Sequence, residues 1–387
     1  MSDRTFFLGE DQRIFRESLA RFFEANWSLA QHRRLADGEP GFSRDAWTKL
    51  AELGALGAFL PERADGAGGG GLELMTAMEA LGRALFISPY LWTVVLASSL
   101  LSAVGKKGDA LLADIAAGKA IIGVALIEPR SRYDLNHVET RARRDGAGYL
   151  LSGKKRGVLY AGAADVVVVP ARTSGEARDH DGISLFLVRT KTPGLVLHSF
   201  ATADGGRAAD LDLNDVRLAD DALLGEVGKG LPLLQRAVDL AIVAQAAEAV
   251  GCMRHLLDST VSYAKTREQF GAKIGSFQAL QHRMVDMFAA TELATSHVQS
   301  VLSRISGPDD ALDPRDAIMV KLQVDKAARL VGQEAIQIHG GMGMTDDLDV
   351  GHYVKRLTMM ALTFADRDKL QERYRALQLL SRDQHQN

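Results

Sequence analysis

Apolar residues are spaced differently in three consecutive parts of the chain. From Asp11 to about Lys119 they recur every three or four positions, which is the spacing of an amphipathic helix. From Ala120 to about Glu226 short β-branched runs replace them, and from Lys229 the helical spacing returns and lasts to the end. The pattern predicts an α+β protein with an N-terminal helical domain (1–119), a central β domain (120–226) and a C-terminal helical bundle (227–387).

The N-terminal part starts with an apolar helical face. This face carries Ile14, Phe15, Leu19, Phe22 and Phe23. Ser43 precedes a second periodic stretch and is a good N-cap, because its hydroxyl can accept a backbone N–H of the first turn. A glycine-rich loop (64–71) separates these helices from two more, predicted over 72–85 and 94–105.

The central part reads as strands. Short β-branched runs lie at 120–128, 164–172, 183–190 and 195–200. Residues 141–153 predict a hairpin with Asp145 and Gly146 near its turn. Because these strands are short and close, with no helices between them, they favour an antiparallel sandwich or barrel over a parallel nucleotide-binding sheet.

The C-terminal part predicts long helices joined by short links. Residues 231–268 form one helix of roughly ten turns. Further helices are expected over 276–306, over 314–341 with Pro314 near its start, and from 351, with a last short one from Arg367. Long helices with short links are typical of an antiparallel four-helix bundle.

Composition narrows the function classes. Lys and Arg total 46 and Asp and Glu total 49, so the net charge of −3 favours neither nucleic acid nor an anionic membrane as a partner. Cys252 is the single cysteine, so no internal disulfide can form. The N-terminal stretch is no secretory signal, and no run reaches the ~18 uninterrupted apolar residues of a membrane span. We expect a cytoplasmic protein.

Two glycine-containing corners carry the candidate chemistry. The first, within 263–287, holds Arg267, Gln269, Phe270 and Gln278 between two helices. The second, "QIHGGMGMTDD" at 337–347, holds the glycine pair Gly340 and Gly341. Taken alone, Arg267 reads as a surface arginine beside a turn. Together, an arginine that can bind phosphate and backbone free of side chains predict a site for a phosphate-bearing heterocycle. No second histidine stands at ligand spacing from His339, so no metal site is expected.

With these corners, the chain resembles the acyl-CoA dehydrogenase family along essentially its whole length. The motifs are "YAKTREQFG…FQALQHRMVDM", "QEAIQIHGGMGMT", "GEDQRIFRESLARFF", "EALGRAL" and "LNDVRLADDALLGEVGKGL". The resemblance implies FAD bound between subunits of a tetramer. It also implies α,β-dehydrogenation of an acyl-CoA thioester, with electrons leaving to an electron-transferring flavoprotein.

The resemblance also implies roles for individual residues. Those implied to contact FAD across the subunit interface are Arg267, Phe270, Gln278, Gln337, Gly340 and Gly341. In the β domain, Leu126, Ile127 and Leu159 match positions beside the flavin ring. Three side chains depart from the family there, because Ile127 and Leu159 replace threonines and Gly157 replaces a tryptophan. The strand could also be a plain sheet element that no longer meets a flavin.

The largest departure concerns the catalytic base. The usual glutamate position is Ala365, and the alternative position on the long helix is Ala241, followed by Ile242. Without a positioned base the α-proton cannot be removed efficiently. The backbone N–H of Ala365 could still bind the thioester carbonyl oxygen, and the missing side chain favours a branched or cyclic acyl group.

Three explanations for the missing base remain open. Asp366 could act as base if the turn shifts by one residue, although it also reads as the first residue of a helix. A partner chain of a heterotetramer could supply the base. Asp239, which matches a family acid facing the substrate, or a water could act instead, although Asp239 could also pair with a neighbour. A non-catalytic partner subunit and a flavin oxidase or monooxygenase are the alternative functions.

Overall fold

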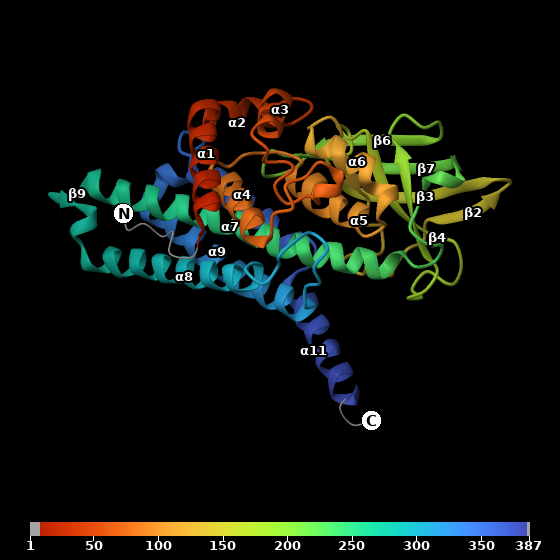
Figure 1. Ribbon diagram of the computed structural model, residues 1–387. Coiled ribbons are helices and arrows are strands. Elements are labelled where there is room, and N and C mark those ends of the chain that lie inside the picture. The colour runs from red at the N-terminus through yellow and green to blue at the C-terminus, as the bar shows by residue number, and fades with distance from the viewer. Residues whose placement is uncertain (1–7, 385–387) are drawn as a thin grey trace.

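The computed structural model describes residues 8–384, and Figure 1 shows its three parts in chain order. Helices from the N-terminal part lie between a sheet at one end of the molecule and long helices that run to the other end. The N-terminal helices are α1 (Glu10–Asn26), α2 (Leu29–Ala36), α3 (Arg44–Glu52), α4 (Gly71–Arg83), a π-helical segment (Leu91–Ala97), α5 (Ser98–Ser102) and α6 (Lys106–Ala116).

The predicted starts of α3 and α4 are confirmed, but the helix predicted over 94–105 is instead a π-helical segment from Leu91 followed by α5, and α2 and α6 were not predicted. The backbone N–H of Ala46 donates to the Ser43 hydroxyl at 3.1 Å, so Ser43 caps α3 as expected. On α1, Leu19 and Phe23 are buried, but Ile14 is 54% exposed. Assigning Ile14 to the buried face was wrong, because the row that packs on α4 advances by four residues, from Phe15 through Leu19 to Phe23.

The β domain is one eight-stranded sheet. Its strands are β1 (Ile122–Val124), β2 (Arg141–Asp145), β3 (Gly148–Leu159), β4 (Val166–Arg172), β5 (Ile183–Arg189), β6 (Leu195–Ala201), β7 (Arg207–Ala219) and β8 (Leu223–Leu224). The order is β6-β7-β3-β2-β4-β5-β8, with β1 beside β4. The expected hairpin is β2–β3, with Gly146 at φ +59° in its turn. The sheet is not wholly antiparallel, because β1 runs parallel to β4 and Arg141 pairs in parallel with Arg172.

The C-terminal part is built around α7 (Gly230–Thr266), whose 37 residues confirm the predicted long helix. Around it are α8 (Gln278–Leu302), α9 (Pro314–His339), α10 (Val350–Leu362) and α11 (Arg367–Gln384). Helix α7 packs against α8, α9 and α10, and also against α4, so it ties the N-terminal part to the bundle. Its length and composition would allow it to cross a membrane, but 89% of its most apolar 18-residue stretch is buried inside the protein. It therefore forms a core helix here.

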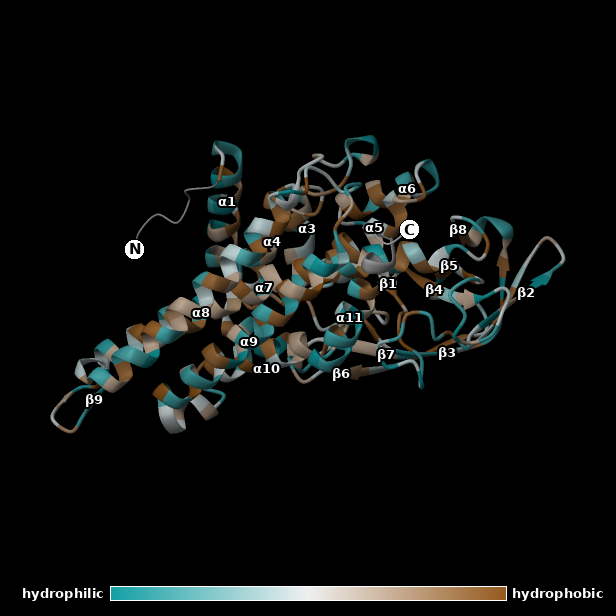
Figure 2. Ribbon diagram, turned by 90° about the horizontal axis from the view of Figure 1, so that it is seen from below, coloured by the Kyte–Doolittle hydropathy of each residue, from teal (hydrophilic) through white to brown (hydrophobic). Residues whose placement is uncertain are grey.

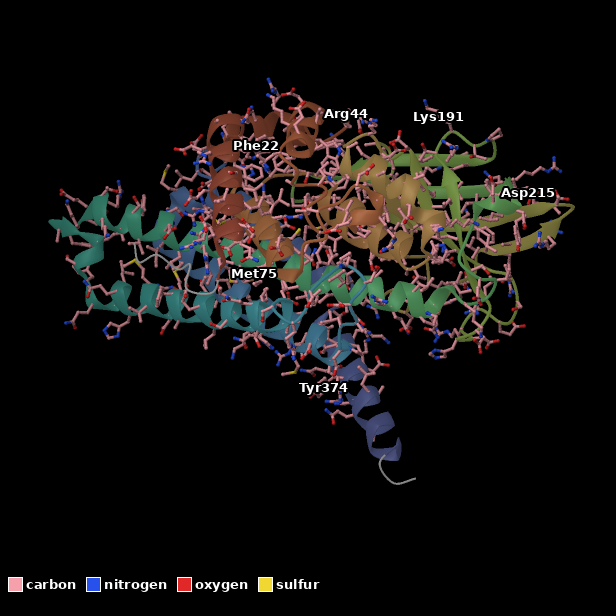
Figure 3. All side chains as sticks on the ribbon, in the orientation of Figure 1. Phe22, Arg44, Met75, Lys191, Asp215 and Tyr374 are labelled. Carbon is pink, nitrogen blue, oxygen red and sulfur yellow. The ribbon has the colours of Figure 1, made fainter. Side chains whose placement is uncertain are left out.

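The two ends of the molecule differ in shape. Between α7 and α8 the chain makes a small hairpin of β9 (Glu268–Gln269) and β10 (Ala272–Lys273), and both ribbon views place β9 at the end opposite the β domain (Figures 1 and 2). Helix α11 has 18 residues, so it is longer than the short helix predicted. It projects from the body, and Tyr374 lies on it (Figure 3).

A buried ionic cluster joins the bundle to the β domain. The Arg356 guanidinium, on α10, lies 2.7 Å from an Asp204 carboxylate oxygen and 2.6 Å from an oxygen of Glu248 on α7. Asp204 lies in the loop between β6 and β7. Burial opposes ionisation of Asp204, but Arg356 together with hydrogen bonds from Thr202 and Gly206 outweighs it, so the pKa of this carboxyl is lowered. The cluster fixes how the sheet sits on the two helices.

Candidate functional site

An open groove of about 710 Å³ lies where α7, the β9–β10 hairpin, the start of α8 and the end of α9 meet. We call it the corner groove. Five of the predicted cofactor residues line it together: Arg267, Phe270, Gln337, Gly340 and Gly341. Gln278 is exposed at the first residue of α8, beside the groove but outside its lining. The structure therefore brings two segments some 70 residues apart in sequence to one surface.

The local geometry of the corner groove suits a ligand that carries phosphate. Gly340 has φ +61°, and a Cβ built on Gly340 or Gly341 would meet open space, so the backbone is accessible there. Within residues 8–384 the Arg267 side chain forms neither a hydrogen bond nor an ion pair, whereas Arg283 nearby is held by Glu334. Phe270 is 95% exposed at φ +56°. The groove thus offers a free cation, a bare backbone and an exposed aromatic ring.

His339 is a packing residue of the same corner. Its ring stacks on Tyr263 with centroids 4.4 Å apart, and its Nδ1 lies 2.8 Å from the Ala335 carbonyl oxygen. Among residues 8–384, no cluster of three or more His, Cys, Asp or Glu side chains could hold a metal ion.

A second cavity, of about 210 Å³, lies between the β domain, α7 and the end of α10. We call it the sheet cavity. The predicted ring-side residues Leu126, Ile127 and Leu159 line it, as does Gly157. Most of its other lining residues are aromatic or apolar, and Trp92 and Phe364 pack with ring centroids 5.3 Å apart. Arg132, Asp134, Arg156 and Thr363 are the polar exceptions.

The sheet irregularity at Gly157 shapes this cavity. The Arg156 N–H donates to the Ile127 carbonyl oxygen at 2.8 Å, which brings Ile127 beside β3. The β3–β7 register shifts between Lys155 and Val158, and Gly157 sits in this bulge at φ +59°. A Cβ on Gly157 would meet open space. The backbone can therefore approach a flat ligand, while the family's tryptophan and threonine side chains are missing.

Both positions at which the family carries its catalytic base are enclosed by other parts of the protein. Ala241 is fully buried in α7. Ala365 packs with Ile318 and Leu370 in a small apolar cluster and lies outside the lining of the sheet cavity. The expectation that its N–H could bind a thioester carbonyl is wrong for this structure, because that N–H donates to the Thr363 carbonyl oxygen at 2.9 Å. Phe364 is the central residue of this tight turn, at φ +66°, and it lines the sheet cavity.

Asp366 and Asp239 each have a structural partner. The Asp366 carboxylate accepts the Lys369 backbone N–H at 2.9 Å and so caps α11. Asp239 is buried, and both its oxygens accept from the Arg373 guanidinium, at 2.6 and 2.7 Å. Burial raises the pKa of Asp239 even against this pairing. Neither carboxylate is among the residues that line the sheet cavity.

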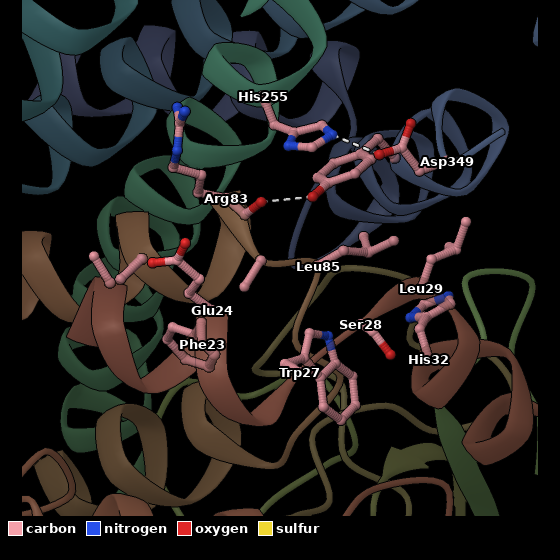
Figure 4. Close-up of a pocket in the computed structure, with 14 residues that line it drawn as sticks. Phe23, Glu24, Trp27, Ser28, Leu29, His32, Arg83, Leu85, His255 and Asp349 are labelled. Atoms are coloured by element: carbon pink, nitrogen blue, oxygen red, sulfur yellow. Dashed lines mark hydrogen bonds and ion pairs between the residues drawn. The ribbon is translucent and has the colours of Figure 1, made fainter. Parts of the chain in front are cut away.

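A third cavity of about 460 Å³ lies in the seam between α1, α4, α7 and α10 (Figure 4). His255 lies 2.6 Å from the Asp349 carboxylate and stacks on Tyr353, whose hydroxyl donates to the Arg83 carbonyl oxygen. The predicted site residues are absent from its described lining. It marks where the N-terminal helices rest on the bundle.

Family models match most of the chain: the N-terminal domain of acyl-CoA dehydrogenases at 9–111, the middle domain at 123–219 and the C-terminal domain at 228–364. The chain is 31% identical over 366 residues to the probable acyl-CoA dehydrogenase YngJ of Bacillus subtilis, covering 92% of this chain and 95% of that protein. The chain belongs to the acyl-CoA dehydrogenase family, whose members are FAD-dependent oxidoreductases acting on CH–CH bonds.

Two solved structures of paired chains are similar to this one. A variant of the Tcur3481–Tcur3483 steroid ACAD has a TM-score of 0.85 and 28% identity, covering 97% of this chain and 99% of that one. The ChsE4–ChsE5 complex from Mycobacterium tuberculosis has a TM-score of 0.84 and 26% identity, covering 95% and 97%. Both confirm the fold.

Sequence reasoning missed several residues of the sheet cavity. Trp92 comes from the N-terminal part, and Arg132 and Tyr133 come from the loop after β1. Burial, followed by the nearby Asp366 carboxylate, raises the pKa of the Tyr133 phenol. The two aromatic residues read as ordinary core residues in the sequence. A paired arginine–tyrosine beside the expected ring-contacting strand was the one available signal.

Proposed function

We propose that this chain binds FAD together with a second, related chain and takes part in the α,β-dehydrogenation of an acyl-CoA thioester. FAD supplies the acceptor for the hydride that leaves the β-carbon, and an electron-transferring flavoprotein takes the electrons onward. The partner chain supplies the catalytic base. The proposal rests on one observation: among the described residues that line the sheet cavity, the single carboxylate is held in an ion pair, while the expected cofactor residues come together in the corner groove.

The separation of the two sites supports a shared flavin. Val238 lines the sheet cavity and Arg267 lines the corner groove, and both belong to one straight run of α7 and its C-cap. At 1.5 Å per residue they lie ~43 Å apart along the helix axis. One dinucleotide does not reach across that distance. Its nucleotide end must therefore bind one chain while its ring lies in the sheet cavity of another.

The charge inventory of the sheet cavity supports a base from outside this chain. Among the described residues that line it, Asp134 is the one carboxylate, and its oxygen lies 2.6 Å from the Lys369 ammonium. Burial disfavours that ammonium, but Asp134 and Glu372 together outweigh it and raise the pKa of Lys369. That carboxylate is therefore already held by a partner within this chain. A second chain in a heteromer would supply the base, and the similarity to the ChsE4–ChsE5 complex supports such an assembly.

The walls of the sheet cavity favour a bulky acyl group. The earlier reason, a missing glutamate side chain at Ala365, does not apply, since Ala365 lies outside the lining. Space for a bulky acyl group comes instead from Gly157, which has no side chain. Trp92 and Phe364 offer flat apolar surfaces for a ring-bearing or branched chain. Similarity to a steroid ACAD points the same way.

The test is an absorbance spectrum of the protein purified alone and after co-expression with adjacent dehydrogenase genes, followed by anaerobic titration with CoA thioesters. We expect flavin colour and substrate-dependent bleaching in the co-expressed assembly, with cyclic or steroid-side-chain thioesters faster than octanoyl-CoA. Bleaching by the chain alone would overturn the need for a partner base. Oxygen consumption without an electron-transferring flavoprotein would favour an oxidase or monooxygenase. A co-expressed assembly that never holds flavin would reduce this chain to a structural partner.

A further inference from the structure

The sheet cavity contains an uncompensated positive charge. Two arginines line it, Arg132 and Arg156. Arg156 is neutralised by the sheet, because its guanidinium lies 3.5 Å from Asp210 and 3.3 Å from Asp212. Within residues 8–384 the exposed Arg132 side chain forms no hydrogen bond or ion pair. The nearby Asp134 does not neutralise it, since that carboxylate is bonded to Lys369.

The loop that presents Arg132 is held firmly. The buried Glu128 carboxylate accepts the backbone N–H of Glu139 at 2.6 Å and the Lys155 ammonium at 2.6 Å. The Glu128 N–H donates to the Ser131 hydroxyl at 2.8 Å, and the Asp134 N–H donates to the Ser131 carbonyl oxygen at 2.8 Å. These hydrogen bonds fix the residues on either side of Arg132 in the sequence.

Arg132 itself adopts a conformation that costs free energy. Its φ of +45° lies in the left-handed region, which L-residues other than glycine, asparagine and aspartate rarely occupy. Glycine would be the undemanding residue here. A strained, unpaired arginine held by a rigid loop beside a largely apolar cavity is better explained by a ligand than by stability.

Resting on the proposed function, we propose that Arg132 is a specificity residue that binds an anionic group of the acyl-CoA ligand. The group is a phosphate of the CoA part or a carboxylate on the acyl part, since a guanidinium binds either with two parallel N–H···O bonds. An apolar acyl chain with its thioester would fill the apolar walls, and the anion would lie at the opening where Arg132 is exposed.

The test measures binding of four probes by calorimetry to the full chain in its purified assembly. The probes are octanoyl-CoA, octanoyl-pantetheine, and the CoA and pantetheine monothioesters of suberic acid. The variants are Arg132→Gly, which also relieves the backbone, and Arg132→Gln. The control is Arg130→Gln, because Arg130 is equally charged, 80% exposed and outside the lining.

We expect both Arg132 variants to lose about 10- to 100-fold in affinity for the probe with the recognised anion, with the control within twofold of wild type. Loss for octanoyl-CoA but not octanoyl-pantetheine identifies a phosphate. Loss for suberyl-pantetheine identifies an acyl carboxylate. Equal binding of the probes by wild type and variants overturns the proposed role of Arg132 and leaves the proposed function standing. A fall in bound FAD with unchanged thioester affinity overturns that role as well. If wild type binds none of the probes, the proposed function fails and this inference falls with it.

Discussion

The corner groove and the sheet cavity are expected to contact opposite ends of two different flavins, and the two regions differ in how far they keep the family's residues. At the corner groove Arg267, Phe270, Gln337 and the two glycines all stand where the family resemblance places them, and they converge. At the sheet cavity the family side chains are replaced, and Ala365 lies in an apolar cluster. The residues expected to bind the nucleotide are present and grouped, whereas those expected beside the flavin ring are replaced.

The difference shows how binding and chemistry depend on different things. Nucleotide binding needs accessible backbone and one free guanidinium. A small number of residues supplies both, and most substitutions elsewhere leave them in place. Proton abstraction needs a carboxylate at one defined point, and a single substitution removes it. A chain that lends its groove to a partner's flavin can keep the first and lose the second.

The largest expected effect comes from putting the family's glutamate back. Ala365→Glu would place a carboxyl among Ile318 and Leu370. Burial there would keep it protonated, and holding a glutamic acid neutral at pH 7 costs roughly 3–4 kcal/mol. We expect this loss of unfolding free energy in denaturant melts, with no gain in flavin reduction by an acyl-CoA.

Ala365→Met is the matched control, because it adds similar length without a charge. The raised folded-state pKa of the new acid means that its cost appears as pH rises above the unfolded value near 4.3 and grows with pH. The methionine variant should show no such slope. A stable Ala365→Glu protein that reduces its flavin would show that the position faces the cavity after all.

The next effect concerns Asp239, the acid predicted to face substrate. Arg373→Met would leave a buried carboxylate unpaired, and we expect a loss of about 2–3 kcal/mol, since Arg373 is partly exposed. The double variant Asp239→Asn with Arg373→Met should recover most of it. If Asp239→Asn instead left stability intact and weakened thioester binding tenfold, the pair would be part of the substrate site.

These two positions show what the sequence can predict. Helical periodicity predicted the length of α7, because periodicity is a local property of the sequence. The grouping of Arg267 with Gly340, two distant segments, was expected from the family resemblance. The Arg373 pairing could not be predicted, because its partner lies 134 residues away and any exposed helix carries such arginines.

The same limit hid other parts of the structure. Arg356 looks like a solvent-facing residue of α10, and only tertiary packing buries it between Glu248 and Asp204. The N–H of Ala365 is engaged by Thr363 because Phe364 adopts a positive φ, which nothing in the letters indicates. Contacts between distant segments and unusual backbone angles are what the sequence left out.

A smaller effect tests the retained end. Arg267→Gln should weaken FAD binding by about 10- to 100-fold in the assembled protein, since the guanidinium is free to bind phosphate. Lys265→Gln removes the same charge two residues away, outside the groove lining, and should change affinity less than threefold. Flavin fluorescence on release measures both. Equal effects would mean that only overall charge matters at this corner.

The smallest effect decides what Asp366 does. As the cap of α11 it should tolerate Asp366→Asn, since asparagine accepts the same backbone N–H, whereas Asp366→Ala should lose about 1 kcal/mol of unfolding free energy. Neither should alter the rate of flavin reduction in the assembled protein, because the cap lies outside the sheet cavity. Stopped-flow reduction and denaturant melts on both variants separate the roles. A hundredfold slower reduction in Asp366→Asn, with stability unchanged, would make Asp366 the base and remove the need for a partner's carboxylate.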